Sequence, residues 1–318
     1  MSEKRPLNRD APAQDGGYAK ESGYAQDGSP ADKSGRGNRG SFARDVRLVA
    51  LDLDGTLLTE EKTVTPRTME TLLRAKARGI LPAVVTGRPL SGIPAELTES
   101  GVIRYAVTSN GAVVHDLAEQ KKIASFLLSG EKVREILSAF QDSEPIYDVV
   151  MDGFGYSDPA SHEKLLRKYA DTAVFPYITS TRRAAESRSA VLQMAERAGA
   201  ENVWIMPDSE KMREAILERL RKISGIYLMR TGHRDLEMTQ ERAGKGRALR
   251  VLLKQLGIPA SECLAVGDDG NDLDLFDAAG ISAAMGNASE EVKRAADFTV
   301  SDNAHDGAAE AVARICGL

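Results

Sequence analysis

The sequence predicts an α/β protein in which a doubly wound, mostly parallel sheet is interrupted by an inserted α/β domain. Two apolar runs, at residues 46–51 and 80–85, flank a segment with clear helix start and stop signals. This strand–helix–strand order is typical of a parallel βαβ unit. The pattern of elements changes after residue 127, and the regular alternation of helix and strand resumes near Gly246. The loss of this alternation after residue 127 and its return near Gly246 together indicate an inserted domain.

These changes of pattern set the expected domain limits. We expect a core domain formed by residues 44–127 and 237–318, and an inserted domain formed by residues 128–236. Residues 1–43 are rich in Gly, Ser and charged side chains and poor in large apolar ones, so they are expected to form a disordered tail. Because no motif lies in this tail, we expect it to be dispensable for function.

The first strand is expected at Val46–Leu51, as a continuous apolar run buried on both faces. A helix follows, with Thr65 as its N-cap, Pro66 at its first position and Gly79 beyond its end. Its predicted buried face consists of Met69, Leu72 and Leu73. Ile80–Val85 is the second strand.

A third strand, Tyr105–Thr108, leads into the turn Ser109–Gly111. Val113–His115 and Lys122–Phe126 are then expected to form a hairpin.

The inserted domain is expected to begin with a helix that follows Ser129. A later helix is capped by Asp208 or Ser209. The strands expected in this part are Ile146–Met151, Asn202–Met206, Ile226–Met229 and Leu236–Met238.

The last part returns to alternating elements. A helix through Leu249 and Leu256 stops at Gly257. The remaining expected elements are the strands Cys263–Val266 and Ile281–Met285, the helices Asn271–Ala279 and Ser289–Ala296, and a final helix carrying Ala309, Val312 and Ile315.

Composition excludes several classes of function. The net charge of -5 and the 5% of aromatic residues argue against a nucleic-acid partner, which needs a basic surface and stacking side chains. Cys263 and Cys316 form no disulfide framework or metal-ligand spacing, and Cys263 is expected to be buried. No run reaches the ~18 apolar residues of a membrane span, so we expect a cytoplasmic protein without a membrane partner. The four histidines, including His233, are expected to be surface or structural residues.

The strongest motif is Asp52-Leu53-Asp54-Gly55-Thr56, directly after the first strand. Ligands of open α/β sheets bind at the carboxyl ends of the strands, where two carboxylates one residue apart are poorly suited to packing. A calcium loop would place its Gly and Glu differently. A plain Asp-Gly turn is the alternative for this motif taken alone.

A second acidic run, Gly267 to Asp272, also follows a buried strand. Asp268 and Asp272 could meet Asp52 in space and suit a hard divalent cation with oxygen ligands. Taken alone, the run also fits an acidic loop that caps a helix.

Two weaker signals complete the set. Thr86-Gly87-Arg88 ends the second strand, where a hydroxyl and backbone N–H groups would suit phosphate. Lys245 stands at a helix start but outside any phosphate-binding loop motif. Taken alone, the first fits a turn and the second a solvated lysine.

In combination and in this order, these motifs resemble the phosphatases of the haloacid dehalogenase superfamily. The resemblance is closest to the Cof-like subgroup (type IIB), which carries an α/β cap between the second and third motifs. Supporting segments are Ser109–Ala112, Leu236–Met238 and Gly286–Ala288. The resemblance covers Val46 to the C-terminus. Phe276 stands where Met is common, a departure that touches no catalytic role.

The resemblance implies a Mg²⁺-dependent phosphatase of small phosphorylated metabolites. Asp52 would attack phosphorus and form an aspartyl-phosphate, and Asp54 would act as general acid and base. Magnesium would be held by the Asp52 carboxylate, the Asp54 main-chain carbonyl and Asp268, with Asp272 behind them. The residues implied for phosphate and substrate binding are Leu53, Thr86, Gly87, Arg88, Asn110, Lys245 and Asn271. Asn110 and the cap would face the leaving group.

The sequence leaves the substrate open among sugar phosphates, pyridoxal phosphate and flavin mononucleotide. A sugar phosphomutase or a disaccharide-phosphate phosphatase is the nearest alternative. A non-catalytic ligand-binding regulator is a further one, against which the intact Asp52, Asp54, Lys245 and Asp268 argue. We expect a monomer or a small homo-oligomer.

Overall fold

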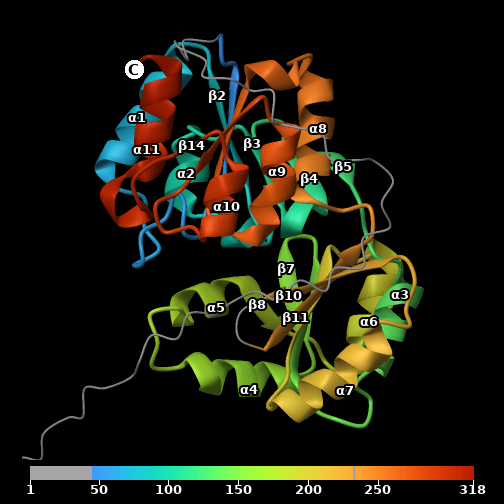
Figure 1. The fold of residues 1–318 in the computed structure, drawn as a ribbon. Coiled ribbons are helices and arrows are strands. Elements are labelled where there is room, and N and C mark those ends of the chain that lie inside the picture. The colour runs from blue at the N-terminus through green and yellow to red at the C-terminus, as the bar shows by residue number, and fades with distance from the viewer. Residues whose placement is uncertain (1–44, 232–233) are drawn as a thin grey trace, which may run out of the picture. The chain divides into compact units, whose positions relative to one another are not determined.

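Two β-sheets organise the protein (Figure 1). The computed structural model describes residues 45–231 and 234–318. The predicted tail at residues 1–43 and the expectation for His233 lie outside the described residues. Among the described residues, no helix is both long and apolar enough to cross a membrane.

The first sheet has eight strands in the order β14-β13-β12-β1-β2-β3-β4-β5. The strands from β14 to β3 are parallel, and β4 and β5 are added antiparallel at one edge. Their bounds are β1 (Leu48–Leu51), β2 (Leu81–Val85), β3 (Tyr105–Thr108), β4 (Val113–Asp116), β5 (Lys121–Ser125), β12 (Cys263–Gly267), β13 (Ile281–Ala284) and β14 (Phe298–Thr299). The predicted doubly wound, mostly parallel sheet and its edge hairpin are confirmed.

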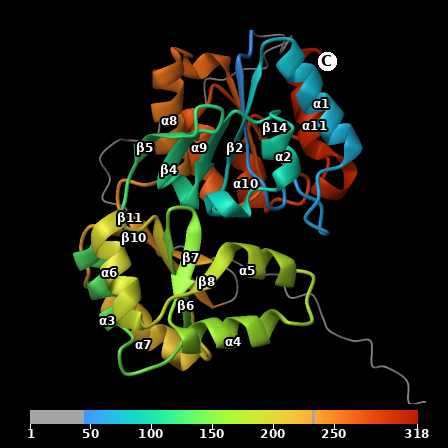
Figure 2. The same ribbon diagram turned by 180° about the vertical axis from the view of Figure 1, so that it is seen from behind.

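Helices cover both faces of this sheet (Figures 1 and 2). On one face, apolar side chains of α1 (Pro66–Ala77), α2 (Ala95–Glu99) and α11 (Gly307–Cys316) pack on the strands. On the other face, α8 (Lys245–Leu256), α9 (Leu273–Ala278) and α10 (Glu290–Ala295) do the same. Cys263 lies in this second core, as predicted.

Helix α1 shows how the local sequence fixes one element. The Thr65 hydroxyl accepts a hydrogen bond from the Thr68 amide at 3.1 Å, and Pro66 occupies the first turn, as predicted. The prediction that Leu73 shares the buried face is wrong, because its side chain is 44% exposed while Leu72 is buried. Successive helical residues differ by about 100°, so two adjacent leucines cannot both face the sheet directly.

The second sheet has six strands in the order β10-β11-β9-β6-β7-β8. Their bounds are β6 (Ile146–Met151), β7 (Phe154–Ser157), β8 (Arg182–Ala184), β9 (Asn202–Met206), β10 (Ile226–Thr231) and β11 (Asp235–Gln240). Strand β11 continues past residue 236, where the sequence placed the end of the insertion.

Two groups of helices pack on opposite faces of the second sheet (Figure 2). The first group is α3 (Gly130–Ser138), α6 (Arg188–Ala198) and α7 (Glu210–Leu220). The second is α4 (Pro159–Tyr169) and α5 (Phe175–Thr181). Ser129, after which the sequence predicted a helix, caps α3. Of the two predicted candidates, Asp208 and Ser209, it is Ser209 that caps α7.

The chain passes between the two sheets twice, after β5 and after β11. At these passages Phe126 and Leu127 pack against a small apolar cluster of Ala112, Val113 and Ala243. The two sheets share no strand, so the connections are short covalent links between separately paired units.

His115 on β4 gives a stability prediction. Its ring is 5% exposed and bonds the Thr108 hydroxyl at 3.1 Å, and burial lowers its pKa to about 4. The unfolded chain therefore binds the proton first as pH falls below about 6.5, which favours unfolding. We expect this residue to remove on the order of 3 kcal/mol of stability between pH 6.5 and 4. In urea titrations, His115→Gln should flatten that acid loss. An unchanged pH slope would contradict the assignment.

Candidate active site

The loops that follow β1 and β12 meet at the carboxyl end of the first sheet. Gly55, with φ +78°, makes this approach possible, because a Cβ there would lie 2.2 Å from Asp268 Oδ2. The Thr56 hydroxyl donates to Asp268 Oδ1 at 2.8 Å. The two acidic motifs of the sequence are therefore in direct contact.

Lys245 joins these motifs from the first residue of α8. Its Nζ lies 3.0 Å from Asp52 Oδ1 and 2.7 Å from Asp272 Oδ1, and the residue is only 2% exposed. Burial disfavours the ammonium, but Asp272 and Asp52 outweigh it and raise the Lys245 pKa. The alternative of a solvated lysine is excluded, because this side chain is the buried counter-charge of two carboxylates.

Asp52, Asp268 and Asp272 form a cluster in which one oxygen of each lies within 4.8 Å of the others. Burial raises the pKa of Asp52 despite the opposing charge of Lys245, and burial raises that of Asp268 to about 7. A divalent cation among them would favour both ionised forms. The all-oxygen donor set suits a hard cation, so these residues fit a divalent metal.

Asp272 has both carboxylate oxygens engaged by the protein. Oδ1 accepts from Lys245, and Oδ2 accepts from the amides of Asp268 at 3.0 Å and Asp269 at 3.1 Å. This arrangement orients the lysine and the Asp268 loop together. These contacts suit a residue that positions Lys245 and Asp268.

The Asp54 carboxylate is not a member of this cluster and pairs with Arg88. Arg88 donates from Nε to Oδ2 at 2.6 Å and from Nη2 to Oδ1 at 2.7 Å, and Lys62 Nζ lies 2.8 Å from Oδ1. Burial opposes ionisation, but these two cations prevail and lower the pKa of Asp54 to about 2. In this arrangement Asp54 is an anion at neutral pH.

In the structure Arg88 pairs with Asp54, whereas the sequence analysis expected it to bind phosphate or substrate. Besides Asp54, its guanidinium donates to the Gly92 carbonyl at 2.9 Å and lies 4.8 Å from the Tyr177 ring centroid. Tyr177 belongs to α5, which packs on the second sheet. A side chain of the inserted segment thus covers the arginine that holds Asp54.

The remaining predicted residues surround the same centre. Thr86 is buried and its hydroxyl accepts from the Arg88 amide at 3.1 Å, which closes the turn. Gly87 lies against Asn110, because a Cβ there would approach its Oδ1 to 3.1 Å. Leu53 is buried beneath the loop. These three residues border the same centre, and their contacts with phosphate stay a prediction.

Asn110 and Asn271 connect this centre to the second sheet. Asn271 accepts from Lys245 Nζ at 3.3 Å and donates to Asn110 Oδ1 at 3.2 Å. Asn110 adopts φ 53° and ψ 38°, a left-handed conformation that Asn tolerates better than most residues. Its amide donates to Glu237 Oε1 at 3.0 Å.

Glu237 was not predicted as a site residue. It lies on β11, accepts a second hydrogen bond from Asn202 at 2.5 Å, and has a pKa raised to about 7 by burial. The sequence marked Leu236–Met238 as a strand and as a supporting segment of the family resemblance, but nothing local showed that Glu237 would reach Asn110. Lys62 and Tyr177 were missed for the same reason, since each meets its partner only in the folded chain.

Comparison with known proteins identifies this architecture. Residues 49–312 match the family of haloacid dehalogenase-like hydrolases. The chain belongs to this family. The family and the hydrolase class predicted from the sequence are thereby confirmed.

Curated and solved members of the haloacid dehalogenase-like hydrolases match most of the chain. It is 29% identical to Phosphatase YwpJ of Bacillus subtilis, covering 83% of this chain and 98% of the relative. It is 26% identical to Pyridoxal phosphate phosphatase YbhA of Escherichia coli, covering 83% and 97%. A haloacid dehalogenase-like hydrolase from Bacteroides thetaiotaomicron superposes with a TM-score of 0.75 at 27% identity, covering 85% and 99%.

Proposed function

We propose that this protein is a Mg²⁺-dependent phosphatase that hydrolyses a small phosphorylated metabolite through an aspartyl-phosphate at Asp52. The observation that carries the proposal is the buried Lys245, 3.0 Å from Asp52 beside two further carboxylates. A lysine and a cation site beside one carboxylate suit an anionic substrate attacked by that carboxylate. The curated relatives, several named as phosphatases, support the same class.

In the first half of the reaction, an Asp52 oxygen attacks phosphorus as the bond to the leaving alkoxide breaks. Asp54 supplies a proton to that alkoxide. Lys245, Asn271, Thr86 and the Leu53 and Gly87 amides would stabilise the phosphoryl oxygens. In the second half, Asp54 takes a proton from the water that attacks the aspartyl-phosphate and releases phosphate.

The Asp52 and Asp268 carboxylates and the Asp54 main-chain carbonyl would hold Mg²⁺. Bound there, it would offset the repulsion between the phosphate and Asp52. Asp272 fixes Lys245 and the Asp268 loop, so we assign it a positioning role.

Asp54 must leave Arg88 before it can carry a proton, because a carboxylate with a pKa of about 2 is a poor acid at neutral pH. Tyr177 belongs to the inserted segment and packs on the Arg88 guanidinium, so the separation of Asp54 from Arg88 involves that segment. We assign the segment from Leu128 to the end of β11 as a cap that closes over the site, hinged near Leu127 and Ala243.

The substrate class rests on the relatives. Among them are a phosphatase of pyridoxal phosphate and one of 5-amino-6-(5-phospho-D-ribitylamino)uracil, YwtE of Bacillus subtilis. A sugar phosphomutase remains the nearest alternative in this fold. Release of inorganic phosphate distinguishes a phosphatase from a mutase, which returns the phosphoryl group to its sugar.

The function is tested by a screen of phosphorylated metabolites that measures released phosphate with Mg²⁺ and with excess chelator. We expect turnover of at least one sugar, pyridoxal or flavin phosphate that depends on the metal. Binding of these compounds without phosphate release would support the non-catalytic regulator instead.

Asp54→Asn and Asp268→Ala separate the proton and metal roles. Asp54→Asn should lower turnover by about 10²–10⁴-fold, the usual contribution of general acid–base catalysis, while Mg²⁺ affinity changes little. Asp268→Ala should weaken Mg²⁺ binding by at least tenfold, because it removes one proposed ligand. Calorimetric titration with Mg²⁺ beside steady-state kinetics measures both. Equal losses of affinity in the two variants would contradict this division.

A further inference from the structure

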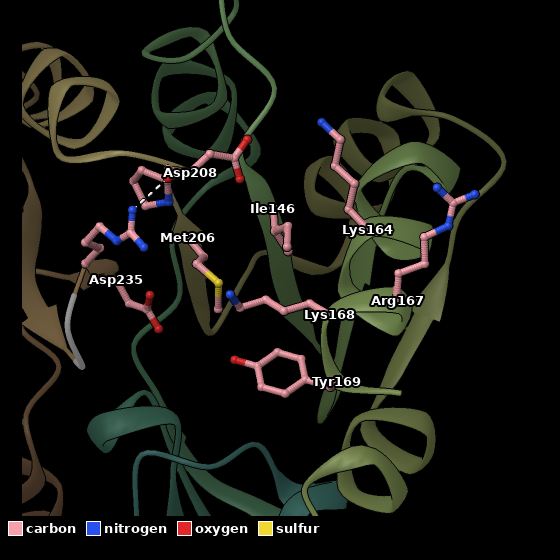
Figure 3. A pocket seen from close by; sticks show the side chains of 10 residues that line it. Ile146, Lys164, Arg167, Lys168, Tyr169, Met206, Asp208 and Asp235 are labelled. Carbon is pink, nitrogen blue, oxygen red and sulfur yellow. Dashed lines mark hydrogen bonds between the residues drawn. The ribbon is translucent and has the colours of Figure 1, made fainter. Parts of the chain in front are cut away.

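A cavity of about 700 Å³ lies on the second sheet beside α4, and none of the residues assigned roles above lines it (Figure 3). Its lining includes the cations Lys164, Arg167, Lys168 and Arg234, together with Tyr169 and Asp235. The volume is within the range of small-molecule sites.

Two of these four cations, Lys168 and Arg234, have no ion-pair partner among the described residues. Lys164 pairs with Glu144, and Arg167 pairs with Glu163. Lys168 has no ion pair with any residue in the described ranges, and Figure 3 shows its ammonium pointing into the cavity near Met206. Arg234 lines the same cavity, where it donates to the Asp208 carbonyl at 2.7 Å, and the two cations together favour an anion there.

The sheet face that lines the cavity continues to the active site. Ile146 pairs with Met206, and Trp204 pairs with Glu237. Side chains two residues apart on a strand share a face, so Asp235 of the cavity lies on the face of Glu237. Glu237 bonds Asn110, so one end of this face borders the catalytic centre and the other lines the cavity.

A second set of contacts links the cavity to the active site. Tyr169 of the cavity packs in one apolar cluster with Trp204 and Tyr177. Tyr177 in turn covers Arg88, which holds Asp54. From Glu237 to Asp235 the strand advances by roughly 7 Å, a span that the body of a metabolite can cross.

We propose that this cavity binds a second anionic group of the substrate, a carboxylate or phosphate remote from the phosphate that is cleaved. The inference rests on the proposed function and narrows its substrate class to elongated phosphate esters with two anionic ends. Lys168 and Arg234 contact the remote anion, and Trp204 lines the path between the two ends.

Matched substrates test the proposal. Glucose 6-phosphate and 6-phosphogluconate differ at the far end by a carboxylate, fructose 6-phosphate and fructose 1,6-bisphosphate differ by a phosphate, and p-nitrophenyl phosphate has no second anion. The wild-type protein should prefer the doubly anionic member of at least one pair in kcat/KM. Lys168→Glu should reduce that preference about tenfold through KM, leave kcat within about twofold, and leave p-nitrophenyl phosphate unaffected.

The control is Lys211→Glu, which reverses an exposed lysine on α7 outside the cavity and should change nothing. Lys168→Arg should restore most of the preference. No preference in the wild-type protein, or an equal loss on all substrates in Lys168→Glu, would overturn the proposal.

Binding separates failure of this inference from failure of the proposed function. If no ester is hydrolysed, the proposed function fails. Calorimetry of 6-phosphogluconate and glucose 6-phosphate with the Asp52→Asn variant still tests the cavity. Tighter binding of 6-phosphogluconate that Lys168→Glu removes would support the anion site, and equal binding of both compounds would refute it.

Discussion

Asp52→Asn should abolish turnover, by about four orders of magnitude or more, while the fold is retained. Asparagine has nearly the same shape as aspartate, and its Oδ1 can still accept from Lys245, which lies 3.0 Å from Asp52 Oδ1. It lacks the negative charge that makes the carboxylate a nucleophile. Steady-state kinetics with p-nitrophenyl phosphate and the thermal unfolding midpoint measure the two effects.

The control for Asp52→Asn is Asp45→Asn, an exposed aspartate before the amino end of β1. It should keep the kcat and unfolding midpoint of the wild-type protein. Residual activity of Asp52→Asn above 1% of wild type in protein free of contaminating phosphatase would contradict the nucleophile assignment. Loss of the folded state would make the kinetics of that variant uninformative, and Asp52→Ser would then replace it.

Lys245→Met should remove both activity and a large part of the stability. The side chain is 1% exposed and is the direct cationic partner of Asp52 and Asp272, so its loss leaves two buried carboxylates unpaired. Breaking a buried pair in this way costs roughly 3–5 kcal/mol, and losing a donor to the phosphoryl group costs about 10²–10³ in kcat. Urea unfolding and phosphate release with saturating Mg²⁺ measure these losses.

Lys254→Met is the matched control for Lys245→Met, since it removes an exposed lysine from the same helix. Its stability should stay within about 0.5 kcal/mol of wild type. A stability loss in Lys245→Met no larger than in this control would show that Lys245 does not stabilise the fold as the counter-charge of Asp52 and Asp272. Added Mg²⁺ should recover part of the stability of Lys245→Met, because a cation can replace the missing charge beside Asp52 and Asp268.

The sequence predicted most of the first sheet because its buried strands carry a strong local signal. Leu48–Leu51 and Cys263–Gly267 are uninterrupted runs of apolar or small residues, and the chemical motifs follow them directly. The region from β7 to α6 received no prediction. Strand β8 is only Arg182–Ala184, with two charged residues, and β7 is only Phe154–Ser157, so both are too short to give a clear strand signal.

The site residues fall into two groups: those that a local motif predicts and those whose partners are distant in the sequence. Asp52, Asp268 and Lys245 could be named from their motifs, and the structure brings them together. Their partners depend on long-range contacts: Lys62 and Arg88 share the Asp54 carboxylate, and Glu237 reaches Asn110 across 127 positions of sequence. No local pattern encodes such distances. A local pattern can also mislead: the adjacent Leu72 and Leu73 suggested one shared buried face, but Leu73 is exposed.

The most direct test of the central claim is to trap the phosphorylated enzyme. In the Asp54→Asn variant, p-nitrophenyl phosphate has a leaving group that needs no acid, whereas hydrolysis of the aspartyl-phosphate still lacks its base, so the intermediate should accumulate. Borohydride reduces an acyl phosphate of aspartate to homoserine, which mass spectrometry locates in a peptide. We predict homoserine at residue 52 after reaction with Mg²⁺ and substrate, and none without substrate. Homoserine at another aspartate, or none at residue 52 while p-nitrophenol is released in a stoichiometric burst, would contradict a phosphoryl transfer through Asp52.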